Sequence, residues 1–264
     1  MRTRKSFFLI PYLIWIALFV VLPILLIIWY SFTNSANQFT LQNYITFFTN
    51  GTFLMMTVNS FWYAFLITLI TLIISYPAAY ALTRVKNQQF WLMLIIIPTW
   101  INLLLKAYAF IGLLGGQGAL NQVLRLIGIG PVNMLFTNTA FILVATYIEI
   151  PFMLLPIYNA LCEINPAVIE ASKDLGASKW QTFRYVILPM AWSGVESGIQ
   201  VVFIPSLSLF MLTRLIGGNR VITLGSAIEE YFMTTMNWNL GSTIGVILIV
   251  MMIGTMLLTS QRKR

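Results

Sequence analysis

Long apolar runs, separated by short polar or glycine-rich segments, dominate this chain. Six of the runs reach the length of about 20 residues that a helix needs to cross a bilayer. They cover Phe7–Tyr30, Ser60–Leu82, Phe90–Leu114, Thr139–Leu161, Val186–Leu212 and Gly241–Ser260. The pattern predicts an all-α, polytopic membrane protein with six transmembrane helices.

The composition fits a chain whose solvent is the bilayer. Hydrophobic residues make up 59% of it, charged residues 8%, and the mean hydropathy is +0.87. The net charge of +8 comes from basic residues that flank the apolar runs, so it favours a topology signal, and we expect no nucleic-acid partner. The chain has no histidine and one cysteine, Cys162. This excludes His-ligated zinc, His-based catalysis and an internal disulfide, and we expect neither a metal site nor enzymatic activity.

Basic residues also predict the orientation. The first apolar run is longer than the core of a signal peptide, and no good small-residue cleavage site follows it, so we interpret it as a retained span. With the N-terminus in the cytoplasm, only Arg125, Arg214 and Arg220 fall in outer segments, and Lys106 falls within a span. This distribution predicts both termini in the cytoplasm. The inner basic residues are Arg2, Arg4, Lys5, Arg84, Lys86, Lys173, Lys179, Arg184, Arg262, Lys263 and Arg264.

Charges gather in the loop of residues 163–189, between the fourth and fifth predicted spans. Asn165 and Pro166 form a helix start, and Gly176 forms a stop. Ser178 and Gln181 form a capping box that begins a second short helix. An apolar stripe is expected on the first helix, formed by Ile164, Val168, Ala171 and Leu175. A helix–turn–helix with an apolar ridge fits docking into another protein, and it fits equally well an amphipathic helix on lipid headgroups.

The stretch EASKDLGASKWQTFRYVILP, Glu170 to Pro189, resembles the cytoplasmic loop of ABC-importer permeases. The family pattern is Glu-Ala-Ala, three residues, Gly, nine residues and Ile-x-Leu-Pro; here Ser172 replaces the second alanine and Val186 the isoleucine. The resemblance implies coupling helices that sit on an ATP-hydrolysing subunit. It assigns the ATPase-coupling role to Glu170, Ala171, Ser172, Asp174, Gly176, Ala177 and Trp180.

The chain contains no G-x-x-x-x-G-K-[ST] phosphate loop. We therefore expect it to bind no cofactor and to take its energy from ATP hydrolysed by a dimer of a partner subunit.

Further motifs, FTLQNYITFF, SYPAAYALTR, IPTWINLLLKAYAF and FIPSLSLFMLTRLIGG, look like those of spermidine/putrescine permeases of the B type. This resemblance covers nearly the whole chain and implies one permease domain over residues 1–264, in a bacterial plasma membrane. It also implies a C-type permease partner, an extracytoplasmic polyamine-binding protein and alternating access. Another ABC-importer substrate, such as thiamine, ferric iron or a phosphonate, and a self-contained secondary transporter are the alternatives.

Lys106, Glu149 and Glu196 fall within predicted spans. A charge at the bilayer centre costs about 3 kcal/mol, so each needs a partner or a purpose. Two carboxylates against one ammonium suit a polycation path. Alternatively, Lys106 neutralises Glu149 in a buried pair. The aromatic faces expected near this path are Trp100, Tyr108, Tyr147 and Trp192.

Three weaker signals complete the pattern. Pro151 and Pro156 interrupt the fourth span, as ordinary kinks or by freeing carbonyl groups toward the path. The motifs GVESG and GSTIG place glycines four residues apart, which permits close helix packing. Ser226 and Glu229 predict a capped external helix, on which Glu229 and Glu230 meet a binding protein, a cationic substrate or solvent.

Overall fold

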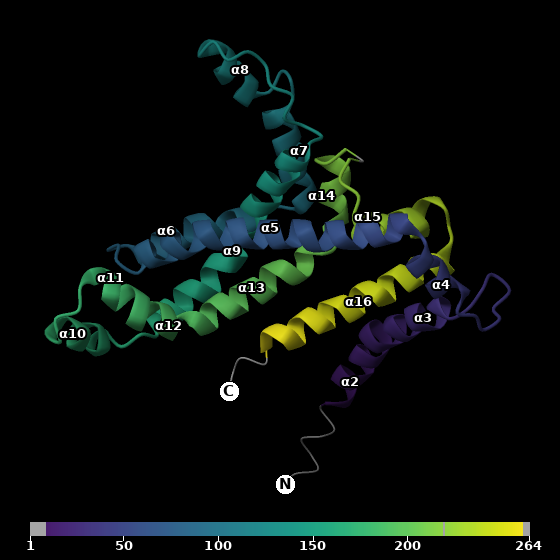
Figure 1. The fold of residues 1–264 in the computed structure, drawn as a ribbon, viewed down its shortest axis with the longest axis horizontal. Coiled ribbons are helices and arrows are strands. Elements are labelled where there is room, and N and C mark those ends of the chain that lie inside the picture. Colours follow the sequence, from purple (N-terminus) through teal and green to yellow (C-terminus); the bar gives the residue numbers. More distant parts are fainter. Residues whose placement is uncertain (1–8, 219, 261–264) are drawn as a thin grey trace, which may run out of the picture. The chain divides into compact units, whose positions relative to one another are not determined.

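The structure, a computed structural model, describes residues 9–218 and 220–260 (Figure 1). The first residues of the predicted first span and six of the basic residues that predict orientation lie outside the described residues: Arg2, Arg4, Lys5, Arg262, Lys263 and Arg264. Within the described part, every regular element is helical, and the one β-bridge joins Thr33 to Phe39. The expected all-α class is confirmed.

Five helical segments of the described chain are long and apolar enough to cross a membrane, and a bent pair makes a sixth if it counts as one span. The prediction of a six-span polytopic protein therefore holds. The segments are Ile10–Ser31, Gly51–Leu82, Leu103–Leu126, Asn138–Cys162, Trp238–Leu257 and the pair Lys179–Met190 with Trp192–Ser206.

The chain forms two compact units, and α5 (Gly51–Leu82) and α16 (Trp238–Ser260) contribute to both. The first unit comprises residues up to Thr57 together with Ala227–Gly254. Its other elements are α2 (Ile10–Ile16), the π-helical turn η1 (Ala17–Val21), α3 (Leu22–Ser31), α4 (Gln42–Thr49), the end of α15 and the π-helical turn η4 (Glu230–Thr234).

In this unit, two asparagines complete the hydrogen bonding at the end of α3. The Asn239 side chain donates to the carbonyl oxygens of Tyr30 (3.2 Å) and Thr33 (2.8 Å). The Asn43 side chain donates to those of Ser31 (3.2 Å) and Thr33 (3.0 Å). The last carbonyls of a helix lack intrahelical donors, so these side chains remove a cost that is high in an apolar environment.

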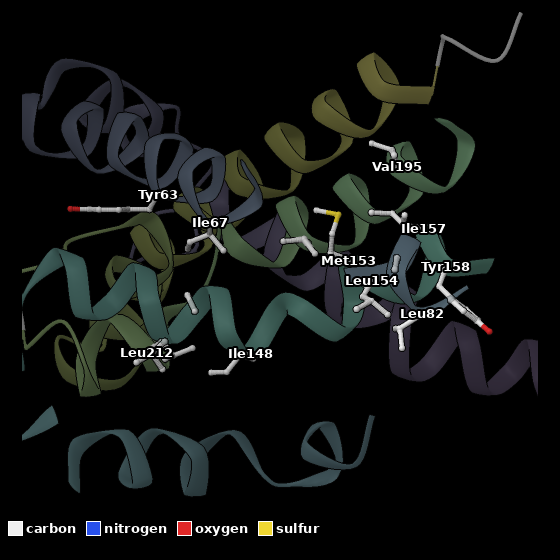
Figure 2. Close-up of a cluster of buried hydrophobic side chains, with 14 of the residues drawn as sticks. Tyr63, Ile67, Leu82, Ile148, Met153, Leu154, Ile157, Tyr158, Val195 and Leu212 are labelled. Carbon is white, nitrogen blue, oxygen red and sulfur yellow. The ribbon is translucent and has the colours of Figure 1, made fainter. Parts of the chain in front are cut away.

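The second unit comprises Val58–Ser226 and the residues from Thr255 onward. It is built around α9 (Asn138–Cys162), which contributes more residues to the buried core of this unit than any other helix. Figure 2 shows that Ile148, Met153, Leu154 and Ile157 of α9 lie in one apolar cluster with side chains of α5, α13 (Trp192–Ser206) and α14 (Phe210–Leu215).

The remaining elements of the second unit are α6 (Gln88–Ile96), the 3₁₀ turn η2 (Ile97–Trp100), α7 (Leu103–Leu114), α8 (Ala119–Leu126), α10 (Pro166–Asp174), α11 (Lys179–Thr182), the π-helical turn η3 (Phe183–Ile187), α12 (Leu188–Met190) and the first half of α15 (Leu224–Glu229).

Two glycines set the contact between α9 and α13. A Cβ at Gly194 would lie 2.5 Å from the carbonyl oxygen of Pro156 and 2.6 Å from Cβ of Ala160, and one at Gly198 would lie 2.7 Å from the sulfur of Met153. At Gly194 the clash is with backbone, which cannot move aside, so a side chain there would force the two helices apart. The GVESG motif is therefore a close-packing site, as expected.

The second motif, GSTIG, is tight only at its first glycine. A Cβ at Gly241 would lie 3.1 Å from the Phe232 ring, whereas one at Gly245 would make an ordinary 3.8 Å contact with Ile27.

The predicted third span, Phe90–Leu114, is wrong as a single helix. α6 ends at Ile96, a 3₁₀ turn follows, and α7 starts at Leu103 with the Asn102 side chain accepting a hydrogen bond from the Leu104 amide. Pro98 provides no amide hydrogen to continue α6, and Asn102 caps the next helix instead. The apolar segment that meets the length of a span begins after this break, at Leu103.

Two further expectations are corrected. The predicted fifth span, Val186–Leu212, starts earlier, at Lys179, bends by 59° at Ala191, two residues after Pro189, and its last helix α13 ends at Ser206. A helix between the last two spans is present, but its capping box is not Ser226/Glu229. Thr223 accepts a hydrogen bond from the Ser226 amide and Ser226 accepts one from the Thr223 amide, so the box lies three residues earlier.

Candidate functional site

The 163–189 loop folds as its capping signals predict. The Asn165 side chain accepts a hydrogen bond from the Ala167 amide (3.0 Å), with Pro166 in the first turn of α10. Gly176 has a φ of +81°. Its amide donates to the carbonyl of Lys173 and the Ala177 amide donates to the carbonyl of Ser172, which is a Schellman motif.

The second short helix of the loop is capped and tied to the first. The Ser178 hydroxyl accepts from the Gln181 amide (3.3 Å), and the Gln181 side chain accepts from the Ser178 amide (2.7 Å), a complete capping box. The Ser172 hydroxyl donates to the carbonyl of Ile169 and lies 3.0 Å from the Thr182 hydroxyl. Ser172, where the family pattern has alanine, therefore links α10 to α11.

The apolar stripe expected on α10 is only partly correct. Ile164 is buried, but Val168, Ala171 and Leu175 are exposed, Leu175 at 89%. Ile169 takes the inward position instead, packed against the core. Trp180 of α11 is also exposed, and so are Glu170 and Asp174. The loop thus presents apolar and acidic side chains outward on a helix pair whose geometry is fixed by its caps.

A large cavity lies behind this loop. It has a volume of about 1130 Å³ and is lined by the end of α5, the start of α6, the end of α9 and the loop helices. Three basic side chains, Arg84, Lys173 and Lys179, line it. The sole cysteine, Cys162, lies at its wall and is exposed.

The polar segment of residues 83–88 forms part of this cavity, which the sequence did not predict. The Tyr158 hydroxyl donates to the Gln88 side chain (2.9 Å), and Gln88 donates to the carbonyl of Thr83 (3.0 Å). The Arg84 guanidinium lies 4.1 Å from the centre of the Tyr80 ring and donates to its hydroxyl. The segment is therefore held against α9. Its composition indicated only a linker, because the partner Tyr158 lies 70 residues away.

Of the charged residues expected along the path, Lys106 and Glu149 lie near enough for their charges to interact. Glu149 lies on α9, about 17 Å along the helix from Asn138 and therefore near its middle. Its side chain is buried, with 6% exposed. The charges of Lys106 and Glu149 interact, but no ion pair of 4.0 Å or less joins them among the described residues. The simple buried pair is thus not what the structure contains.

A cavity of about 180 Å³ lies between the broken third span and α9, and Lys106 lines it but Glu149 does not. Pro98 and Thr99 of η2, Lys106 of α7, and Tyr147 and Pro151 of α9 line it, together with Leu94, Ile95, Ile148 and Ile150. Tyr147 also packs edge-on against Phe110, with ring centres 5.1 Å apart.

The other expected path residues lie elsewhere. Trp100 is 82% exposed and Tyr108 is also exposed, so both side chains lie on the surface of this chain. The Trp192 indole donates to the Glu196 carboxylate (2.7 Å) one turn away on α13. Glu196 therefore has a local partner, unlike Glu149.

Among the described residues, no group of three His, Cys, Asp or Glu side chains is arranged to hold a metal ion.

Comparison with known proteins gives matches along nearly the whole chain. Residues 39–262 match the family described as binding-protein-dependent transport system inner membrane component. The spermidine/putrescine transport system permease protein PotB of Haemophilus influenzae is 34% identical over 248 residues, covering 90% of this chain and 86% of the relative. PotB of Escherichia coli K12 is 34% identical over 258 residues, covering 94% and 93%.

A solved structure shares the fold. The crystal structure of a bacterial ABC transporter involved in the import of the acidic polysaccharide alginate aligns with a TM-score of 0.83 at 18% identity, covering 98% of this chain and 96% of that chain. At this identity the likeness concerns the fold alone.

Proposed function

Because the chain belongs to the family of binding-protein-dependent transport system inner membrane components, we propose that it is a B-type permease subunit of an ABC importer that moves polyamines into the cell. It is a multi-pass inner-membrane protein. The observation that carries the substrate class is the 34% identity to spermidine/putrescine permeases over nine-tenths of the chain.

The 163–189 loop is the proposed docking site for the ATP-binding subunits. A capped helix pair with exposed Val168, Leu175 and Trp180 offers an apolar ridge of fixed shape, which a groove on a soluble partner can cover. Glu170 and Asp174 stand beside this ridge. This chain has no phosphate loop, so ATP is hydrolysed by the partner dimer, and this chain catalyses no reaction.

The proposed orientation places this loop, both termini and the segment of residues 83–88 in the cytoplasm. A C-type permease completes the translocation path, and a polyamine-binding protein delivers the substrate from the outer side. Exposed aromatic side chains such as Trp100 and Tyr108 then face the second permease, the lipid or the shared path. ATP binding moves the loop helices, and the spans alternate between outward-facing and inward-facing states.

Uptake of labelled spermidine tests the proposal. Vesicles contain this chain with its partner permease, the ATPase and the binding protein, with or without ATP, and with putrescine, thiamine or ferric iron as competitors. We expect uptake that requires ATP and is blocked only by polyamines. Inhibition by thiamine or ferric iron in place of polyamines would assign another substrate to the same machinery. Uptake without ATP would indicate a secondary transporter.

A further inference from the structure

The large cavity behind the 163–189 loop lies where two membrane-length helices end. α5 ends at Leu82 and α9 ends at Cys162, and Thr83 and Cys162 both line the cavity. Every described residue that lines it belongs to the second unit, so the cavity is formed within one compact part of the chain. The end of a span lies at the headgroup region of the bilayer. A ligand can therefore enter this cavity from the lipid as well as from water.

The charges that line this cavity all have the same sign. Arg84, Lys173 and Lys179 line it, and the described lining residues include no aspartate or glutamate. Lys173 and Lys179 are exposed and make no hydrogen bond or ion pair within the described chain. Cations that share one space repel each other unless an anion lies among them. The cavity therefore favours an anionic ligand.

Arg84 is already positioned for such a ligand. Its guanidinium lies 4.1 Å from the centre of the Tyr80 ring and donates to the Tyr80 hydroxyl. The segment that carries Arg84 is held against α9 by the hydrogen bond from Tyr158 to Gln88 (2.9 Å). A guanidinium has five N–H donors, so most of them remain for a ligand. Arginine donors match the geometry of phosphate oxygens, which favours a phosphate among the possible anions.

Apolar side chains complete the lining of the cavity. Leu161, Ile164 and Ile187 are buried, and Ile169 and Phe183 are half-buried. The volume of about 1130 Å³ is that of some tens of water molecules, far more than one inorganic phosphate fills. A ligand that uses the whole space needs an anionic head and an aliphatic part. An anionic phospholipid has both, and basic pockets at the cytoplasmic ends of membrane helices bind such headgroups.

We propose that this cavity binds one anionic phospholipid of the inner leaflet, with its phosphate among Arg84, Lys173 and Lys179 and its acyl chains against the apolar lining. The inference rests on the proposed function for the cytoplasmic orientation of this end of the chain. Arg84 belongs to the segment of residues 83–88, Lys173 to α10 and Lys179 to α11. A headgroup bound among them ties that segment to the loop helices. The lipid thus holds the proposed ATPase-docking helices in place.

Alkylation of Cys162 tests the site directly, because this sole cysteine lines the cavity. The full chain is placed without the ATPase in nanodiscs of phosphatidylcholine, with or without about a third of phosphatidylglycerol. The reagent is N-ethylmaleimide, which carries no charge. We expect phosphatidylglycerol to slow the reaction at least about fivefold in the wild type. In Lys173→Gln/Lys179→Gln this slowing should be lost. An equal rate with both lipids in the wild type overturns the lipid site.

Lys86→Gln/Arg184→Gln is the matched control. Lys86 and Arg184 are exposed basic residues that do not line the cavity, and the control variant loses the same number of charges as the test variant. It should keep the full slowing by phosphatidylglycerol. An anionic membrane surface also slows a thiol by disfavouring its thiolate, but this effect is the same in both double variants. Equal rates in the two double variants therefore overturn the proposal.

Soluble anions distinguish the source of the phosphate. Inorganic phosphate or ATP, added to nanodiscs of phosphatidylcholine alone, should not slow the alkylation of Cys162. If either anion protects Cys162 as well as phosphatidylglycerol does, the cavity is a site for a soluble phosphate and the lipid is overturned.

The role of the lipid is measured in the complete importer. Phosphatidylglycerol should raise the maximal rate of ATP-dependent uptake about twofold or more in the wild type and in Lys86→Gln/Arg184→Gln, but not in Lys173→Gln/Lys179→Gln. A rise of the same size in all three overturns the role in holding the docking helices. The alkylation experiment requires no transport. Absence of spermidine uptake with intact lipid protection of Cys162 would therefore count against the proposed substrate and not against the lipid site.

Discussion

Gly176 is the residue on which the shape of the 163–189 loop depends most directly. Its φ of +81° lies in the left-handed region, and the two Schellman hydrogen bonds around it require this conformation. No heavy atom lies within 4 Å of a Cβ built there, so a side chain would have space. The constraint is therefore on the backbone alone, where an ordinary L-residue pays about 1–2 kcal/mol.

Because the constraint at Gly176 concerns the backbone conformation and not the space for a side chain, two substitutions should have different effects. Gly176→Val should reduce co-purification of the ATPase about tenfold and reduce uptake with it, because a β-branched residue disfavours the turn. Gly176→Asn should stay close to the wild type, since asparagine tolerates the left-handed region. Pull-down of the ATPase with tagged permease measures both. Normal recovery of the ATPase with the valine variant would show that the turn does not set the docking geometry.

At the residue scale, local signals in the sequence predicted the structure well. The caps at Asn165 and Ser178 and the stop at Gly176 all form, because each depends on residues within a few positions of it. The capping box predicted at Ser226 was displaced, since Thr223 offers a hydroxyl one turn earlier. Which face of α10 is buried could not be predicted, because Ile164 and Ile169 pack against distant parts of the chain.

At the scale of elements, the crossing of α9 and α13 is the tightest contact in the second unit. Gly194→Leu should lower the free energy of unfolding of the second unit by about 1–3 kcal/mol or more. A Cβ at this position meets the Pro156 backbone at 2.5 Å, and backbone cannot rotate away as a side chain does. The midpoint of thermal unfolding of the purified chain in detergent measures the effect. We expect a clear decrease, with Gly194→Ala intermediate.

Gly254→Leu is the matched control for this prediction. Gly254 also lies in a helix, α16, but no heavy atom lies within 4 Å of a Cβ built on it. Its substitution should leave the midpoint almost unchanged. Equal decreases for Gly194→Leu and Gly254→Leu would mean that leucine acts through the helix itself and not through the α9–α13 contact.

The same scale shows where hydropathy stops being informative. A run of apolar residues predicts that a segment enters the membrane, but not that its backbone stays helical. The run Phe90–Leu114 contains Pro98 and Asn102, and the structure breaks there. The break is also what puts η2 beside Tyr147 and Pro151 of α9. Pairing of segments that lie about 50 residues apart depends on tertiary packing, which the one-dimensional pattern does not contain.

For the whole molecule, the sequence predicted the all-α class and the helix pair of the 163–189 loop. Glu149 and Lys106 were identified because charges in apolar runs are costly. Trp100, Tyr108 and Glu196 were grouped with them from position along the spans. Of these five residues, only Lys106 lines the cavity between η2, α7 and α9.

The predicted orientation of the chain in the membrane rests on the distribution of basic residues alone. The sole cysteine allows this orientation to be measured directly. Cys162 is exposed at the end of α9, next to the 163–189 loop. The positive-inside distribution predicts that this end faces the cytoplasm. A membrane-impermeant maleimide should therefore label the chain in inside-out vesicles and not in right-side-out vesicles. Because no other cysteine is present, no background has to be removed.

A second variant reports on the opposite side. Gly51, the first residue of α5, is exposed with no heavy atom within 4 Å of a Cβ built on it, so Gly51→Cys in a Cys162→Ser background is tolerated sterically. It should label only in right-side-out vesicles. Labelling of Cys162 from the outer side, with Gly51→Cys reacting from the inner side, would invert the proposed topology and place the 163–189 loop where no ATPase can reach it. If the topology is as proposed, bound ATPase should also slow the labelling of Cys162, because this residue lines the cavity behind the docking helices.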